Sequence, residues 1–219
     1  GLFLQKATHD VDYIFYLLGA QPVEVAAMES KTVFTGDRPA QLKCADCAER
    51  RTCDESPFVL QHRYNRGPAK GEYCCFSTGT GNHDSATMLM RMADGRHVVY
   101  SQNFYARRLA ARRGARFIGY KGTMEMDFPS GTITVYGHQY AEKQVYTIDQ
   151  QGLGHFGGDR FLIEGFLQLI ADPAAPSAAP LRAGIDSAAL CLAAAQSARQ
   201  GVFLRRSETD GWFSEGSAL

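Results

Sequence analysis

Residues 85–106, SATMLMRMADGRHVVYSQNFYA, contain two runs of strand length joined by a short turn. In both runs apolar and polar side chains alternate, which is typical of strands that bury one face. The segment between them, Ala93–Arg96 (ADGR), has the composition of a tight turn. The two runs are therefore predicted to pair as an antiparallel hairpin, and an antiparallel sheet is the central element predicted for this chain.

Other runs of strand length lie on both sides of this hairpin. They cover residues 22–34, 72–77, 115–122, 123–128, 132–137 and 143–148. Helical periodicity is found near both ends of the chain, in residues 10–18, 159–171 and 184–201. This order predicts an α+β fold, an open and mostly antiparallel β-sheet with helices packed on one face in two layers. We expect one domain over residues 1–206, with a cysteine-bearing loop at 36–72 and a frayed polar tail at 207–219.

Composition excludes several classes of protein. The chain has 219 residues, 45% of them hydrophobic, which is enough for one sizeable core. Its 23 basic and 23 acidic side chains balance, so no basic surplus indicates nucleic-acid binding. No apolar run approaches the roughly 20 residues of a membrane helix. No secretion signal opens the sequence, and we therefore expect a cytoplasmic protein. Because Gly1 opens in the middle of a structural pattern, we expect a fragment or a processed chain.

The segment QKATHDVD, residues 5–12, places Lys6, His9 and Asp12 at the start of the first predicted helix. In one interpretation it is an exposed helix start, capped by Thr8 or His9. In the other it is half of an active site, in which His9 relays a proton at neutral pH and Lys6 holds a hydroxyl or an alkoxide. Spacing alone favours the first interpretation.

Six cysteines are present, and five of them lie within residues 44–75. Cys44 and Cys47 form a C-x-x-C pair, Cys53 follows, and Cys74 or Cys75 could return as a fourth ligand. Four thiolates on tight loops suit tetrahedral zinc, and Cys75 is taken as the fourth ligand of this candidate structural site. Reduced thiols on a loop, or a disulfide, are the alternatives.

The sequence GLGHFG, residues 152–157, matches the G-x-G-x-x-G pattern of dinucleotide-binding loops. A dinucleotide fold also needs a buried strand before the loop and a parallel strand after the helix. The preceding residues are polar and no such strand follows, so a glycine-rich turn into a helix is favoured. His155 and Asp159 are kept as residues that can face a cleft from this turn. The chain by itself is not expected to bind NAD or NADP.

Four stretches, in order, resemble one known family, the glucose–fructose oxidoreductase and inositol dehydrogenase (Gfo/Idh/MocA) family. They are residues 5–27 (QKATHDVDYIFYLLGAQPVEVAA), 84–106, 116–128 (RFIGYKGTMEMDF) and the two helical segments 154–170 and 184–201. The insert CADCAERRTC, residues 44–53, is similar to one found in some branches of the family. The match covers most of the chain and corresponds to the family's second, C-terminal domain.

The resemblance implies a function. Family members carry an N-terminal Rossmann domain for NAD or NADP, and His9 matches the histidine that their second domain contributes to the active site. Many members have an aspartate four residues before that histidine, where this chain has Gln5 followed by Lys6. Lys6 and His9 are therefore the expected catalytic pair. The residues expected to bind a sugar or polyol substrate are Asp12, Tyr105, His155 and Asp159.

The rival hypothesis is a non-catalytic α+β assembly module that could bind zinc. An upstream G-x-G-x-x-G segment after a strand would support the dehydrogenase, and its absence would support the module. Under either hypothesis we expect a homo-oligomer. The runs MLMRM (88–92) and VVYSQNFY (98–105) are predicted to mark an apolar sheet face that a second subunit covers.

Overall fold

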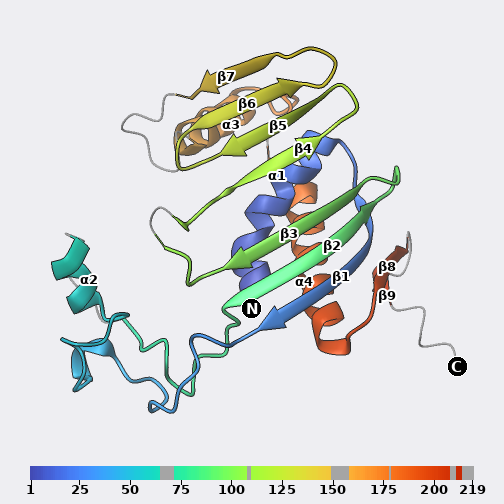
Figure 1. Cartoon of the computed structure of the whole chain (residues 1–219). Coiled ribbons are helices and arrows are strands. Elements are labelled where there is room, and N and C mark those ends of the chain that lie inside the picture. Colours follow the sequence, from blue (N-terminus) through green and yellow to red (C-terminus); the bar gives the residue numbers. More distant parts are fainter. Residues whose placement is uncertain (65–71, 108–109, 149–157, 178, 208–210, 214–219) are drawn as a thin grey trace, which may run out of the picture. The chain divides into compact units, whose positions relative to one another are not determined.

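The computed structural model describes residues 1–64, 72–107, 110–148, 158–177, 179–207 and 211–213. It confirms the α+β fold with open antiparallel sheets, but it contains two sheets rather than one. The chain divides into two compact units (Figure 1). Unit 1 comprises Gly1–Tyr105 and Leu181–Leu219, and unit 2 comprises Ala106–Pro180.

Unit 1 is built on a five-stranded sheet in the order β3-β2-β1-β8-β9. Its strands are β1 (Pro22–Ser30), β2 (Ser85–Met92), β3 (His97–Asn103), β8 (Leu204–Ser207) and β9 (Gly211–Phe213). All neighbouring pairs are antiparallel, with Leu89 opposite Val99 in the predicted hairpin. The frayed tail predicted from residue 207 is wrong at Ser207 and over Gly211–Phe213, where β8 ends and β9 forms, because strands of three or four residues are too short to show a hydrophobic pattern.

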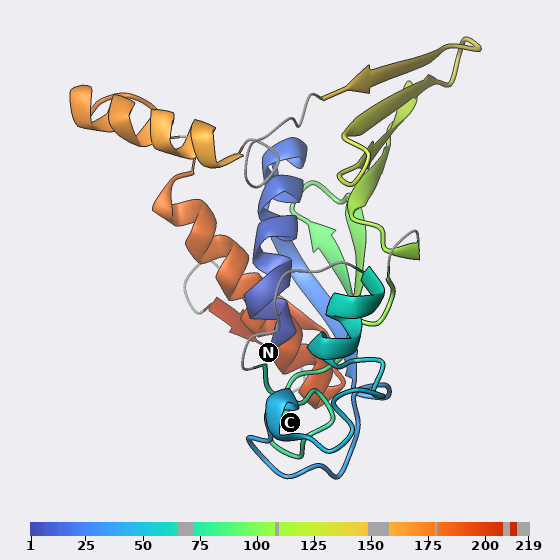
Figure 2. The ribbon, with the colours of Figure 1, turned by 90° about the vertical axis from the view of Figure 1, so that its left-hand side faces the viewer.

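Two helices of unit 1, α1 (Thr8–Leu18) and α4 (Leu181–Gln200), cover one face of this sheet (Figure 2). Gly19 has a positive φ of 60° and ends α1 in the left-handed conformation that glycine tolerates, as predicted. The core between the helices and the sheet consists of apolar side chains that are fully or almost fully buried. They include Phe3, Val11, Ile14 and Phe15 from the N-terminal helices, Val25, Met88, Met90, Met92 and Leu204 from the strands, and Leu190 and Ala194 from α4.

This burial corrects one prediction about the sheet. Met88, Met90 and Met92 were expected to mark the uncovered face, but they lie under the chain's own helices. Side chains of a strand alternate between faces, so Leu89 falls on the uncovered face instead. Val99, its cross-strand partner, and Met28 of β1 are exposed on the same side.

Residues 31–84, called the excursion below, leave the sheet between two strands that pair directly. Ser30 at the end of β1 is opposite Ser85 at the start of β2, so the excursion begins and ends at neighbouring points. It contains a short 3₁₀-helix, Cys44–Asp46, and the helix α2 (Pro57–Tyr64), where only loop was predicted. The strand predicted at 72–77 is wrong, because residues 73 and 77 make only isolated bridges, to Lys43 and Arg38.

Asp84 ties the start of the excursion to its end. Its side chain is 1% exposed, and its Oδ2 atom accepts hydrogen bonds from the backbone N–H groups of Thr32, Val33 and Phe34 at 2.9, 2.6 and 2.9 Å. Burial acts to raise the pKa of Asp84, but the three N–H donors outweigh burial, and the pKa lies below its ordinary value. The carboxylate therefore stays ionised and holds the turn that follows β1.

The described residues of unit 2 form a four-stranded antiparallel sheet in the order β4-β5-β6-β7 and a helix. The strands are β4 (Gly114–Ile118), β5 (Gly122–Asp127), β6 (Thr132–Gly137) and β7 (Lys143–Thr147), and the helix is α3 (Gly158–Ala171). The residues that were predicted to form one apolar helical face, among them Phe161 and Phe166, are exposed on α3. No helix among the described residues of either unit is long and apolar enough to cross a membrane.

Candidate functional site

The N-terminal segment begins with an uncommon helical turn. Residues Phe3–Ala7 form a π-helix that continues directly into α1. Ala7 and Thr8 both have right-handed helical backbone angles, and no side-chain cap is present at their junction, so the predicted cap at Thr8 or His9 is wrong. The Thr8 hydroxyl instead donates back to the Leu4 carbonyl at 3.3 Å. Single π-turns are rare in proteins overall, but those that do occur are often found at functional sites.

Lys6 and His9 are exposed on either side of this junction. Their neighbours Phe3, Ala7 and Val11 are buried, which fixes the rotation of the helix and directs the two polar side chains away from the core. Within the part of the chain that the structure describes, neither side chain makes a hydrogen bond or an ion pair. An imidazole and an ammonium group are thus presented to solvent from adjoining turns, available to a ligand.

Asp10, next to His9, points into unit 1. The Tyr100 hydroxyl of β3 lies 3.0 Å from Asp10 Oδ2 and 3.1 Å from Gln102 Oε1. Burial raises the pKa of Tyr100, and the charge of Asp10 raises it further. Burial, followed by the same carboxylate, raises the pKa of the Cys191 thiol to about 12. Tyr100 therefore keeps its proton and fixes one side of α1 to the sheet.

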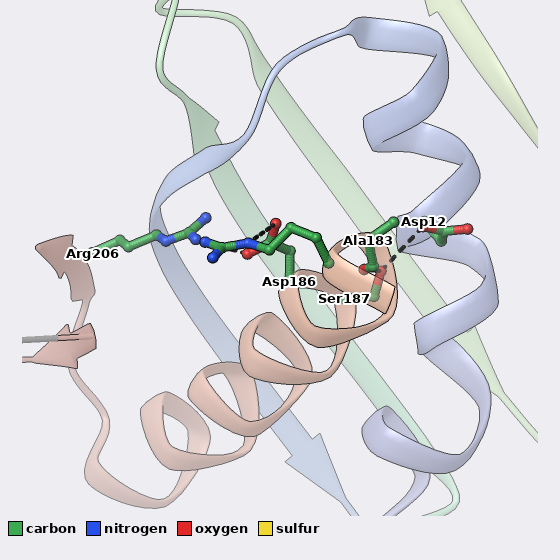
Figure 3. Close-up of polar contacts among 6 residues, drawn as sticks. Asp12, Ala183, Asp186, Ser187 and Arg206 are labelled. Carbon is green, nitrogen blue, oxygen red and sulfur yellow. Dashed lines mark hydrogen bonds and ion pairs between the residues drawn. The ribbon is translucent and has the colours of Figure 1, made fainter. Parts of the chain in front are cut away.

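Asp12 contacts the other helix of unit 1. The Ser187 hydroxyl of α4 lies 3.4 Å from Asp12 Oδ1, and it also donates to the Ala183 carbonyl at 2.8 Å (Figure 3). Asp12 is half-buried rather than fully presented to solvent. It therefore contributes to the contact between α1 and α4, in addition to its predicted role with substrate.

A second carboxylate of α4 links that helix to strand β8. Asp186 is buried, and its two oxygens accept hydrogen bonds from Arg182 at 3.0 Å and from Arg206 at 2.8 Å (Figure 3). Because both of its oxygens are occupied by the chain's own arginines, we assign Asp186 to holding α4 against β8 rather than to ligand binding. The sequence analysis did not select Asp186, because its partner Arg206 belongs to a strand that was not predicted.

The other predicted substrate residues lie elsewhere in the chain. Tyr105 is exposed at the end of unit 1, two residues after β3. Asp159 lies in the first turn of α3 in unit 2. His155 and the GLGHFG segment fall outside the described residues. Only Lys6, His9 and Asp12 are thus brought together on one element.

All six cysteines are free thiols. Cys44 opens the 3₁₀-turn, Cys47 follows it, Cys53 precedes α2, and Cys74 and Cys75 are neighbours on the returning segment. Among the described residues, no group of three or more histidine, cysteine, aspartate or glutamate side chains stands in position to hold a metal ion. The thiols are therefore gathered in one segment without forming a completed coordination shell.

We predict that Tyr100→Phe lowers the free energy of unfolding by about 1–2 kcal/mol, because a half-buried carboxylate loses a hydrogen-bond donor. Urea denaturation measures the change. Tyr16→Phe is the matched control, since Tyr16 is exposed on α1, the helix that Tyr100 contacts. Equal stability of the two variants would mean that the Tyr100 hydroxyl does not hold α1.

The comparison with known families identifies the family of this domain. The sequence model described as the GFO/IDH/MocA C-terminal domain matches residues 1–125, more than half of the 219-residue chain. The chain belongs to the Gfo/Idh/MocA family. No curated protein with which this Gfo/Idh/MocA domain was compared matches it.

Solved structures show the same fold at low sequence identity. An oxidoreductase domain protein from Kribbella flavida is 16% identical with a TM-score of 0.66, over 93% of this chain and 50% of that one. UDP-N-acetylglucosamine 3-dehydrogenase from Acidithiobacillus ferrooxidans is 19% identical with a TM-score of 0.57, over 88% and 45%. An oxidoreductase from Agrobacterium radiobacter, solved with NAD+, L-tartaric acid and magnesium, is 13% identical with a TM-score of 0.59, over 91% and 47%.

The Gfo/Idh/MocA chain described here thus spans about half the length of these solved structures. At such identities the likeness shows a shared fold. The family membership relates the chain to oxidoreductases, and some of its structural neighbours are sugar dehydrogenases or bind NAD.

Proposed function

We propose that this chain is the substrate-binding and oligomerisation domain of an NAD- or NADP-dependent dehydrogenase that acts on a sugar, a polyol or a related hydroxyl compound. The observation that carries the proposal is the exposed Lys6–His9 pair at the junction of the π-helix and α1. Family membership and the sugar-nucleotide dehydrogenase among the structural neighbours support it.

The described residues do not fit a dinucleotide pocket. All ladders between the named strands are antiparallel, whereas a dinucleotide fold needs parallel strands. We therefore assign the cofactor to a domain outside this chain. Nicotinamide supplies hydride exchange when it is bound, and this domain supplies orientation and proton transfer.

In the proposed reaction His9 exchanges a proton with the reacting hydroxyl group of the substrate. Imidazole suits this role because its ordinary pKa lies close to neutral pH. Lys6 donates a hydrogen bond to the same oxygen and stabilises negative charge that develops on it. Asp12, Tyr105, His155 and Asp159 are proposed to hold the other hydroxyl groups. The Tyr100–Asp10 contact keeps the helix that carries His9 in position.

The alternative is a non-catalytic assembly module with the same fold. Turnover by the full-length protein distinguishes the two, and the test on His9 is given in the Discussion. We also propose a cytoplasmic location, because a reducing compartment preserves free thiols such as those of this chain.

The uncovered face of the five-stranded sheet is proposed to form a subunit interface. Met28 and Val99 are 79% and 68% exposed there, with Leu89 beside Val99. At one end of this face, Glu24 pairs with Arg91 at 2.6 Å and with Arg205 at 2.7 Å. Exposed apolar residues bordered by charged groups are typical of a surface that a second copy covers.

We predict that Val99→Glu shifts the chain from oligomer to monomer, because it places an unpaired charge within the proposed interface. Multi-angle light scattering at micromolar concentration measures the mass. Tyr16→Glu is the control, since Tyr16 is also strongly exposed, at 82%, but lies on α1 outside the proposed interface. A monomeric wild-type chain, or the same mass for both variants, would contradict the interface.

A further inference from the structure

The excursion, residues 31–84, has almost no hydrophobic core of its own. Its fully buried side chains among the described residues are Ser56, Cys74, Ser77 and Asp84, and none of them is a large apolar residue. It is nevertheless folded back on itself, with α2 and the 3₁₀-turn between its ends. A segment of this size that lacks a core needs another source of stability, and in small protein modules that source is commonly a set of disulfides or a structural metal.

Backbone hydrogen bonds bring the cysteine-bearing parts of the excursion together. The Cys44 N–H donates to the Glu72 carbonyl at 2.9 Å, and the Cys74 N–H donates to the Leu42 carbonyl at 2.8 Å. These two bonds flank the antiparallel bridge between Lys43 and Tyr73, so Cys44 and Cys74 come from adjacent, paired segments. They lie far apart in sequence, and sequence spacing alone could not have paired them.

The C-x-x-C segment turns back toward Cys44. The Cys47 N–H donates to the Cys44 carbonyl at 3.3 Å, which closes the turn between the first two thiols. The Cys53 N–H donates to the Glu49 carbonyl at 2.9 Å in the following turn. The Arg50 N–H donates to the Cys47 carbonyl at 3.2 Å, so consecutive backbone turns link Cys47 to Cys53.

We propose that Cys44, Cys47, Cys53 and Cys74 bind one structural zinc ion that holds the excursion together. Four clustered thiolates repel one another, and a divalent cation that binds all four offsets this repulsion. Zinc takes four thiolates in a tetrahedral site, on loops of the C-x-x-C kind. Each thiol that coordinates releases its proton to solvent, so up to four protons leave when the ion binds.

The fourth ligand is Cys74 rather than Cys75. The Cys74 N–H donates to the carbonyl of Leu42, which lies two residues before Cys44, so the backbone pairs Cys74 with the segment that leads into Cys44. The described side chains do not yet stand at a metal-binding arrangement, so we expect zinc to draw the four sulfur atoms together and to stiffen the excursion.

The test uses the full chain, purified without chelator and analysed for metal by mass spectrometry. We expect about one zinc ion per chain for the wild type and for Cys75→Ser, and none for Cys44→Ser or Cys74→Ser. Cobalt added to metal-free protein gives an independent readout, since tetrahedral thiolate coordination produces intense visible and near-ultraviolet bands. Those bands are expected in Cys75→Ser and absent in Cys74→Ser.

Far-ultraviolet circular dichroism of the chelator-treated wild type checks that the sheet remains folded without zinc. The proposal is overturned by a metal-free wild type in which the five thiols of the excursion react freely with a thiol reagent. Iron with acid-labile sulfide, or a disulfide within the group, also overturns it. If Cys74→Ser keeps zinc and Cys75→Ser loses it, the ligand assignment is wrong. The proposal is independent of the dehydrogenase function, because none of these measurements requires turnover.

Discussion

Replacing His9 by alanine in the full-length enzyme is expected to lower kcat about 10²–10⁴-fold, the usual effect of losing a positioned acid–base group. The Kd for the nicotinamide cofactor is expected to stay close to that of the wild type, because we assign the cofactor to another domain. Steady-state kinetics and a cofactor titration measure the two quantities. A lowered kcat together with an unchanged Kd for the cofactor is expected only of a residue that acts on the substrate.

The structure makes this experiment easy to interpret. His9 is exposed inside a continuous helix and caps nothing, so its removal should leave the melting temperature almost unchanged. Tyr16→Ala, an exposed position on the same helix, controls for effects on helix α1. Normal turnover by His9→Ala would refute the catalytic assignment and would favour the assembly module.

Asp84→Ala is expected to have the largest effect on stability, a loss of about 3 kcal/mol in the free energy of unfolding. The substitution leaves the backbone N–H groups of Thr32, Val33 and Phe34 without their buried acceptor, and hydrogen bonds to charged groups are the costly ones to lose. Urea denaturation measures the change. Asp94→Ala is the control, because Asp94 lies in the exposed β2–β3 turn and should tolerate the same change.

The same carboxylate predicts a pH dependence. The pKa of Asp84 is lowered in the folded state, so its contribution is fully present above the unfolded value of about 3.9 and is lost as pH falls through the folded value. The difference in stability between wild type and Asp84→Ala should therefore shrink below about pH 4. A difference that is constant down to the lowest pH at which the protein stays folded would contradict this assignment.

Local signals in the sequence were sufficient for most elements of the fold. Val11, Ile14 and Phe15 gave α1 its period, Gly19 gave its end, and the ADGR turn gave the β2–β3 hairpin. Local signals do not show which part of the protein packs against each face of a helix or strand. Alternation separates Met88 from Leu89 but does not say which of them the helices will cover.

The candidate site could likewise be predicted from the sequence only in part. Lys6 and His9 could be selected from the sequence, because their residue types and the family resemblance point to them. The π-turn before α1 could not be selected, since no residue type specifies it. Tyr100 could not be chosen either, because its role depends on a contact with a helix some 90 residues earlier in the chain.

The pairing of Ser30 with Ser85 has a consequence for how such a protein can change over evolutionary time. The two residues are opposite each other in the sheet, so the segment between them can change in length without changing how β1 pairs with β2. The entropy of closing a loop grows slowly with its length, about 0.6 kcal/mol for each doubling, so a long insert at this point costs little more than a short one. The junction between β1 and β2 is therefore a position at which related proteins can gain or lose a cysteine-rich insertion while the helix that carries His9 keeps its place.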